Sequence, residues 1–340
     1  MRITYWDYWK GISIIAVVLI HASGIAASYP IYSLNFNTGI IIRQFINFSV
    51  PVFLFISGYF SYSEKYSGQY QYIKKRGFRI TTPYLAWTII YISIATYNGL
   101  FMPTVKNITA NFLLGTGIGV GYFVIVLLQF VLITPILYKI KSIKLHILLL
   151  FLISILGVLY TYISNYKLPG TRLSQFPYSA LPFFVWYPFF HLGFALSRFS
   201  PKIKMSNNLL YFLIVLGVIF SLLEGFIESS TLGYGFAVSQ LKLSSLTLST
   251  IICIVIYKNK DNSLPANNIL VQIGNMSYGI YLTHMLFITS YGGILKGTYM
   301  NNNMLLYIFT LALLSLLSSI LMVLLIDKLV NNRIKPFIIG

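Results

Sequence analysis

The residue best suited to acid–base chemistry in this sequence is a histidine inside a long apolar segment. His21 follows Lys10 after ten intervening residues, and Asp7 lies about one helical turn before Lys10. Imidazole changes its charge near neutral pH, so a buried histidine can take a proton from a hydroxyl nucleophile. A histidine that only packs against its neighbours in a helical bundle is the alternative interpretation of His21.

Other ionisable residues also interrupt apolar segments, where each costs about 2.5–3.5 kcal/mol on the insertion scale. His284 follows Tyr281 by three residues, so the two share a helical face. Glu224 and Glu228 are one turn apart and are two of only six acidic residues in the chain. These carboxylates could accept hydrogen bonds from the hydroxyls of a polar acceptor such as a sugar. The alternatives are the polar end of a helix for the glutamates and an interfacial anchor for His284.

The densest run of basic residues spans residues 74–79. Arg76 and Arg79 share a helical face, and a guanidinium binds phosphate through two parallel hydrogen bonds. The run predicts a cytoplasmic site for a phosphate-bearing ligand, although an anchor on anionic lipid would also explain it. The single cysteine, Cys253, excludes an intrachain disulfide and a thiol-based metal site, and we predict no metal.

The composition identifies the elements that must position these residues. Of 340 residues, 57% are hydrophobic and 9% are charged, and the mean hydropathy is +0.78. Soluble domains contain roughly 25% charged residues, and disordered chains are poor in apolar ones, so both classes are excluded. The sequence therefore predicts an all-α polytopic membrane protein, with residues 1–340 forming one domain.

Apolar segments separated by polar breaks predict about ten transmembrane helices. These segments cover residues 11–28, 40–62, 83–101, 120–138, 145–163, 179–197, 208–226, 241–257, 269–291 and 303–326. With these spans, 18 of the 24 Lys and Arg residues lie on one side of the membrane and 6 on the other. By the positive-inside rule, this asymmetry predicts that the N- and C-termini are cytoplasmic. The net charge of +18 then reflects topology rather than nucleic-acid binding.

Several short motifs occur one after another along the chain. They are Lys10 with His21, the segment 51–60 that contains Ser57 and Tyr59, the basic segment 76–84, and the segments 187–193 and 277–284. Together they resemble the acyltransferase-3 family of bacterial integral membrane acyltransferases. The first pair is similar to the Arg/Lys-x10-His signature of that family. Gly121-Tyr122-Phe123 departs from the resemblance, because the family usually has a Trp-Phe pair there.

The resemblance implies transfer of an acyl group, most often acetyl from acetyl-CoA, to a hydroxyl of a cell-envelope sugar or glycolipid. It implies His21 as the catalytic residue and Lys10, Arg76 and Arg79 as contacts of the acyl donor. Lys10 replaces the usual Arg and so lacks its bidentate fork. We expect supporting or acceptor-side roles for Asp7, Ser57, Tyr59, Glu224, Glu228, Tyr281 and His284. Ser57 could be a nucleophile by its position, or a small packing residue.

The expected partners are acyl-CoA, a lipid-linked or polymeric envelope sugar and membrane lipid, with no permanently bound cofactor. The expected location is the bacterial cytoplasmic (inner) membrane, with the first helix as a signal anchor. A transporter or flippase of a lipid-linked sugar is the alternative function, because buried polar residues could also line a substrate path. The sequence shows none of the internal repeats that many transporters carry.

Overall fold

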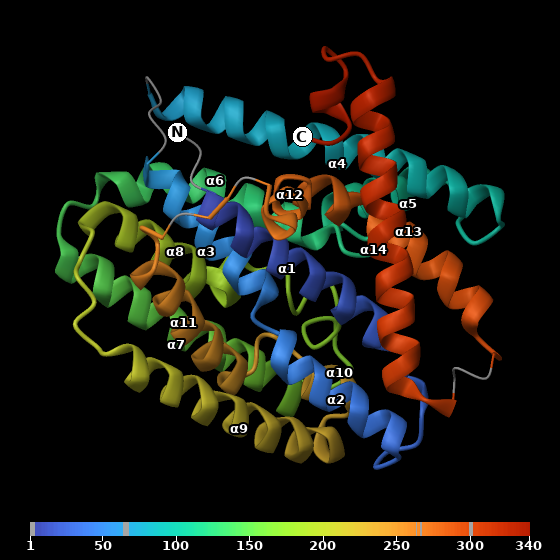
Figure 1. Ribbon diagram of the computed structural model, residues 1–340, viewed down its shortest axis with the longest axis horizontal. Coiled ribbons are helices and arrows are strands. Elements are labelled where there is room, and N and C mark those ends of the chain that lie inside the picture. The colour runs from blue at the N-terminus through green and yellow to red at the C-terminus, as the bar shows by residue number, and fades with distance from the viewer. Residues whose placement is uncertain (1–3, 64–67, 263, 266, 299–301) are drawn as a thin grey trace.

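A computed structural model describes residues 4–63, 68–262, 264–265, 267–298 and 302–340, and these residues form helices and loops without any strand (Figure 1). Its elements are α1 (Thr4–Ala22), η1 (Ser23–Ser28), α2 (Leu34–Ile46), α3 (Ser49–Ser63), α4 (Gln69–Tyr97), α5 (Val105–Leu114), α6 (Tyr122–Lys139), α7 (Ile143–Tyr166), α8 (Phe183–Phe199), α9 (Asn207–Thr231), α10 (Tyr234–Ala237), α11 (Leu243–Lys258), α12 (Ile269–Asn275), α13 (Ser277–Leu295), α14 (Met304–Leu329) and η3 (Lys335–Phe337).

Several helical segments are long and apolar enough to cross a membrane. Within the described ranges there are six of them: Thr4–Ser28, Leu34–Tyr62, Tyr122–Lys139, Ile143–Tyr166, Asn207–Thr231 and Met304–Leu329. Only 17% of the apolar window in α7 and 22% of that in α9 is buried inside the protein. Large apolar side chains on the outer faces of these two helices, such as Phe151 and Leu223, are exposed. Such faces suit contact with lipid, and the chain is a multi-pass membrane protein.

Helix occupies part of every segment that the sequence predicted to span the membrane, but several boundaries differ. The segment 40–62 is divided between α2 and α3, and the segment 269–291 is divided at Met276 between α12 and α13. Helix α4 begins at Gln69, before the predicted span that starts at residue 83, because the basic run is also helical. A search for apolar segments does not detect this polar part of the helix. Ten transmembrane helices and cytoplasmic termini stay predictions.

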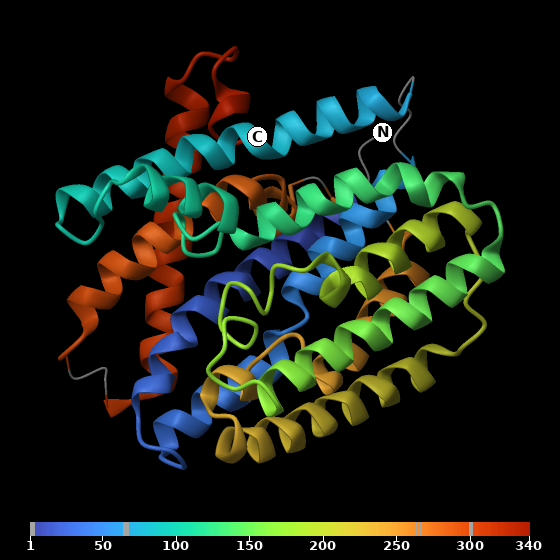
Figure 2. The same ribbon diagram turned by 180° about the vertical axis from the view of Figure 1, so that it is seen from behind.

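Helix α1 lies in the interior of the bundle and contacts α3, α12, α13 and α14 (Figures 1 and 2). Its approach to α12 depends on two glycines. A Cβ at Gly274 would overlap the carbonyl oxygen of Asp7, and a Cβ at Gly11 would overlap the carbonyl oxygen of Leu270. The two backbones are therefore in direct contact. This contact fixes the position of the N-terminal part of α1, the end that is predicted to be cytoplasmic.

Helices α3 and α8 meet in the same way. A Cβ at Gly58 would overlap the carbonyl oxygen of Phe190, and a Cβ at Gly193 would overlap that of Phe55. Beside this contact the ring of Phe190 stacks on Phe130 of α6, with ring centroids 4.3 Å apart. Small residues that let helix backbones approach closely are the usual means of packing helices within a membrane.

We predict that Gly274→Ala and Gly58→Ala each destabilise the protein, because the added methyl group must displace backbone on the facing helix. Overpacking of this kind costs about 1–3 kcal/mol. The measurement is thermal unfolding of the purified variants in detergent. Gly293→Ala on α13 is the matched control, since a Cβ there meets nothing within 4 Å. Equal unfolding temperatures for Gly274→Ala and Gly293→Ala would contradict the predicted contact.

Candidate functional site

A cavity of about 710 Å³ lies among α1, α3, α4, α6 and the junction of α12 with α13, and we call it the basic cavity. It brings together six of the residues singled out from the sequence: Asp7, Lys10, Ser57, Arg76, Arg79 and Tyr281. Lys75 from the same basic run also lines it. The described lining thus has four cationic side chains and one acidic side chain, so the cavity is positively charged.

Lys10 is held in the basic cavity by two partners. Its Nζ lies 3.1 Å from Oδ1 of Asp7, one turn earlier on the same face of α1, and 5.7 Å from the ring centroid of Phe60. Asp7 is only 3% exposed, whereas the Lys10 side chain is 29% exposed. The carboxylate near the N-terminus of α1 is favoured by the helix dipole. Lys10 therefore presents a fixed, partly accessible positive charge.

The arginines enter the basic cavity from α4. The Nη2 group of Arg76 donates to the carbonyl oxygen and to Oγ of Ser57, at 3.0 Å each. Arg79 follows one turn later and is exposed, as is Lys75. Arg76 is thus oriented by α3, and its neighbours on α4 reach solvent at the entrance. The Ser57 hydroxyl accepts a hydrogen bond from Arg76.

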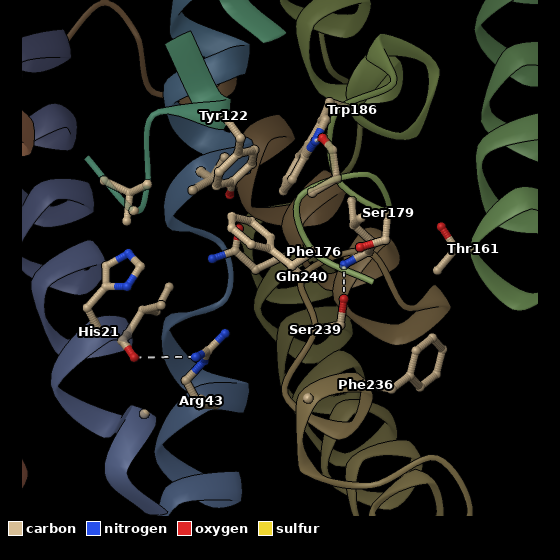
Figure 3. Close-up of a pocket in the computed structure, with 18 of the residues that line it drawn as sticks. His21, Arg43, Tyr122, Thr161, Phe176, Ser179, Trp186, Phe236, Ser239 and Gln240 are labelled. Atoms are coloured by element: carbon tan, nitrogen blue, oxygen red, sulfur yellow. Dashed lines mark hydrogen bonds between the residues drawn. The ribbon is translucent and has the colours of Figure 1, made fainter. Parts of the chain in front are cut away.

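A second cavity, of about 590 Å³, contains His21, and we call it the His21 cavity (Figure 3). His21 is partly exposed, and the lining of the cavity combines aromatic residues such as Tyr122 and Phe176 with uncharged polar residues such as Gln240. Arg43 of α2 lies on the same side of this cavity as His21 in Figure 3. The predicted catalytic histidine and the predicted donor contacts therefore lie in two different cavities.

The same four helices line both cavities at different heights. Helix α1 gives Lys10 to one and His21 to the other, and α3, α6 and α13 contribute in the same way. On α6, Tyr122 faces the His21 cavity and Phe123 faces the basic cavity. Lys10 and His21 are eleven residues apart, which is roughly 16 Å along a helix. The two cavities are therefore stacked along the bundle.

Three aromatic residues close the inner end of the basic cavity. The ring of Phe123 lies 5.6 Å from that of Tyr281 and 6.4 Å from that of Phe53, measured between centroids. The hydroxyl of Tyr281 donates to the carbonyl oxygen of Val120, which lines the His21 cavity, at 2.5 Å. These side chains form an apolar wall between the positive charges and His21.

His284 lies behind His21 and lines neither cavity. Its ring centroid is 5.3 Å from that of His21, and its side chain is fully buried. Nδ1 lies 2.7 Å from the carbonyl oxygen of Tyr281 and 3.1 Å from that of Ile280. Because carbonyl oxygens only accept, Nδ1 carries the proton and Nε2 is left with a lone pair. Nε2 has no hydrogen-bond partner within the described chain.

Glu224 lines neither of the two cavities. Its carboxylate accepts hydrogen bonds from the Tyr162 hydroxyl and from the backbone N–H of Ser244, and Oε2 lies 3.8 Å from Nζ of Lys242. Lys242 is fully buried and also donates to Oε1 of Gln44 at 2.8 Å. This cluster joins α2, α7, α9 and the start of α11.

Glu228 and Tyr59 also lie outside the two cavities. The Glu228 carboxylate accepts hydrogen bonds from the Tyr166 hydroxyl, at 2.6 and 2.7 Å, and from Thr231. The ring of Tyr59 packs against Trp6, with centroids 4.5 Å apart. Neither Glu228 nor Tyr59 lines either cavity.

Among the polar residues that line the His21 cavity, the sequence analysis did not select Arg43 or Gln240. Arg43 could have been noticed, because it is a basic residue within the predicted span 40–62. Gln240 lies in the loop between α10 and α11, and no pattern in the sequence marks it. Tertiary packing alone brings this loop to α1 and α2.

We predict that Glu224→Leu destabilises the protein by about 3–5 kcal/mol, because it leaves Lys242 buried without its carboxylate. Thermal unfolding in detergent measures this effect. Asp261→Leu is the control, since the Asp261 side chain is 87% exposed and its loss should change stability little. A wild-type unfolding temperature for Glu224→Leu would contradict a structural role for Glu224.

Comparison with known proteins adds one match. A family model described as an acyltransferase domain matches residues 3–324, which include all the polar residues of both cavities discussed above. No curated protein and no solved structure matches the chain.

Proposed function

Because the chain belongs to the acyltransferase-3 family, whose model covers nearly all of it, we propose that it moves an acetyl group from acetyl-CoA to a hydroxyl of a cell-envelope sugar. One observation carries this proposal: α1 presents Lys10 to a positively charged cavity and His21 to a second cavity, lined by aromatic, aliphatic and uncharged polar residues with Arg43 as its one cation among the described lining residues. A charged donor and a sugar acceptor need two such environments. The family match gives no support to the transporter alternative.

In this proposal the basic cavity binds the phosphates of coenzyme A. Lys75, Arg76 and Arg79 project from one stretch of α4, and Lys10 faces them from α1. Guanidinium and ammonium groups bind phosphate through charge-assisted hydrogen bonds. The basic cavity then faces the cytoplasm, where acyl-CoA is found, and the membrane is the bacterial cytoplasmic membrane.

The uncharged arm of the donor would pass the aromatic wall. Phe53, Phe123 and Tyr281 offer apolar surface to this arm and no charge that would hold the phosphates further in. The thioester would then reach His21 while the phosphates stay with the cations. Rearrangement of these aromatic side chains would open the passage between the two cavities.

His21 acts as the general base. It takes the proton of the acceptor hydroxyl while the hydroxyl oxygen attacks the thioester carbonyl carbon. Collapse of the tetrahedral intermediate forms the ester, breaks the carbon–sulfur bond and returns the proton from His21 to the leaving thiolate. The lone pair on Nε2 of His284 would stabilise the His21 imidazolium. Ser57 lies in the other cavity and accepts a hydrogen bond from Arg76, which favours direct transfer without an acyl-serine.

We predict that His21→Ala lowers acyl transfer by about 10²–10⁴-fold, the usual contribution of a general base. Membranes containing the variant are incubated with radiolabelled acetyl-CoA, and alkali-labile label is measured in the glycolipid and polysaccharide fractions. Met285→Leu, at another residue of the same cavity, is the control and should keep its activity. Wild-type transfer by a well-inserted His21→Ala protein would remove His21 from the mechanism.

We predict that Arg79→Gln raises the KM for acetyl-CoA about tenfold or more, because a hydrogen bond to a charged group contributes about 1.5–3 kcal/mol. The KM for S-acetylpantetheine, which lacks the phosphates, should not change. Lys141→Gln, at an exposed lysine outside the basic cavity, is the matched control. An equal rise in KM for both donors would argue against phosphate binding by Arg79.

A further inference from the structure

Arg43 is held rigidly beside His21. Nη1 donates to the carbonyl oxygen of Ile20 at 3.3 Å, Nη2 to that of Val238 at 2.9 Å, and Nε to Oδ1 of Asn47 at 3.3 Å. A guanidinium has five N–H groups, so two remain after these three bonds. Ile20 directly precedes His21 on α1, and Arg43 itself lines the His21 cavity. The two remaining N–H groups of Arg43 are therefore held in a fixed position beside His21.

No carboxylate compensates the charge of Arg43. Its three acceptors are neutral oxygens, and none of the ion pairs found in the described chain includes it. Neither aspartate nor glutamate occurs among the described residues that line the His21 cavity. Arg43 is half-buried, and a charge that is withdrawn from water is normally paired, because desolvation without a partner is costly. An anion supplied by a ligand would provide that partner.

Gln240 adds an unpaired acceptor to the same cavity. Its side chain is 8% exposed, and Oε1 has no hydrogen-bond partner within the described chain. Figure 3 shows Gln240 across the cavity from His21 and Arg43. A buried amide oxygen without a partner is destabilising, so the site favours a ligand with a donor at this position. A sugar hydroxyl is such a donor, and the exposed ring of Phe176, which also lines the cavity, offers an apolar surface to the sugar.

We infer that the acceptor bound in the His21 cavity is an anionic sugar, with Arg43 binding its negatively charged group and Gln240 accepting a hydrogen bond from one of its hydroxyls. This inference rests on the proposed function for its choice of an acyl acceptor. The anionic group is an oxyacid, which is either a carboxylate on the sugar ring or a phosphate attached to the sugar. Both present oxygens that suit the remaining N–H groups of a guanidinium.

Binding without any acyl donor tests the charge preference directly. The purified protein in detergent is titrated with methyl β-D-glucuronide, with glucose 1-phosphate and with neutral methyl β-D-glucoside. At least one anionic probe should bind about tenfold or more tightly than the glucoside, as expected for a charge-assisted hydrogen bond. The anionic probe that binds more tightly identifies the oxyacid. Equal affinities for the three probes, or no binding of any, would overturn the inference.

Variants assign the preference to Arg43. Arg43→Gln should bring the anionic probes to the affinity of the glucoside, whereas Arg43→Lys should keep part of the preference. Arg172→Gln, at an exposed arginine outside the cavity, is the matched control. Gln240→Leu should weaken all three probes by a similar factor. Persistence of the anionic preference in folded Arg43→Gln protein would overturn the inference.

Acyl transfer from labelled acetyl-CoA to the same probes separates the two proposals. Anion-selective binding without transfer would overturn the proposed function and leave the anion site intact. Equal transfer to neutral and anionic probes, slowed equally by Arg43→Gln, would assign Arg43 to the oxyanion of the tetrahedral intermediate. That result would overturn the anionic acceptor and support acyl transfer.

Discussion

The direct backbone contact between α1 and α12 is the constraint on which the site depends. A side chain at Gly11 or at Gly274 would overlap the backbone of the facing helix, so the two glycines let α1 and α12 pack in one close arrangement. Because α1 is a continuous helix, the distance between Lys10 and His21 is fixed by helical geometry, and the contact with α12 fixes where both lie in the bundle. A shift at the glycines would move Lys10 in one cavity and His21 in the other together. The site is therefore built from one rigid element rather than from two independent ones.

The apolar wall of Phe53, Phe123 and Tyr281 separates the basic cavity from the His21 cavity. Phosphates and a proton-transfer centre have opposite requirements, since the former need several cations and water, and the latter needs a defined, water-poor environment. Phe123 and Tyr281 separate the two environments within the thickness of a few side chains. Tyr281 is also tied to the backbone of Val120 on the other side of the wall.

Local spacing predicted what lies on single helices, and it could not predict what tertiary packing assembles. The ten residues between Lys10 and His21, and the one turn between Arg76 and Arg79, are fixed by helical geometry, and the structure places both pairs at cavities. The partners of Glu224 and Glu228 lie 62 residues away on α7, so the sequence could not show that their carboxylates are engaged. Gln240 reaches the His21 cavity only because its loop packs against α1 and α2. The break between α2 and α3 likewise lies inside the segment 40–62, which hydropathy alone predicts as one span.

The fully buried Lys242 and the half-buried Arg43 show how the few acidic residues of this chain are distributed. Lys242 has the carboxylate of Glu224 and several hydroxyl and carbonyl oxygens around it, so its charge is compensated within the protein. Arg43 has only neutral oxygens. Among the described acidic residues, Asp7 alone lines either cavity, and it is already paired with Lys10. The one carboxylate side chain among the described lining of the basic cavity is thus engaged by Lys10, and the described lining of the His21 cavity has none. In both cavities the cationic side chains of the described lining outnumber the acidic ones, which is the physical basis of the proposed binding of negatively charged ligands in both.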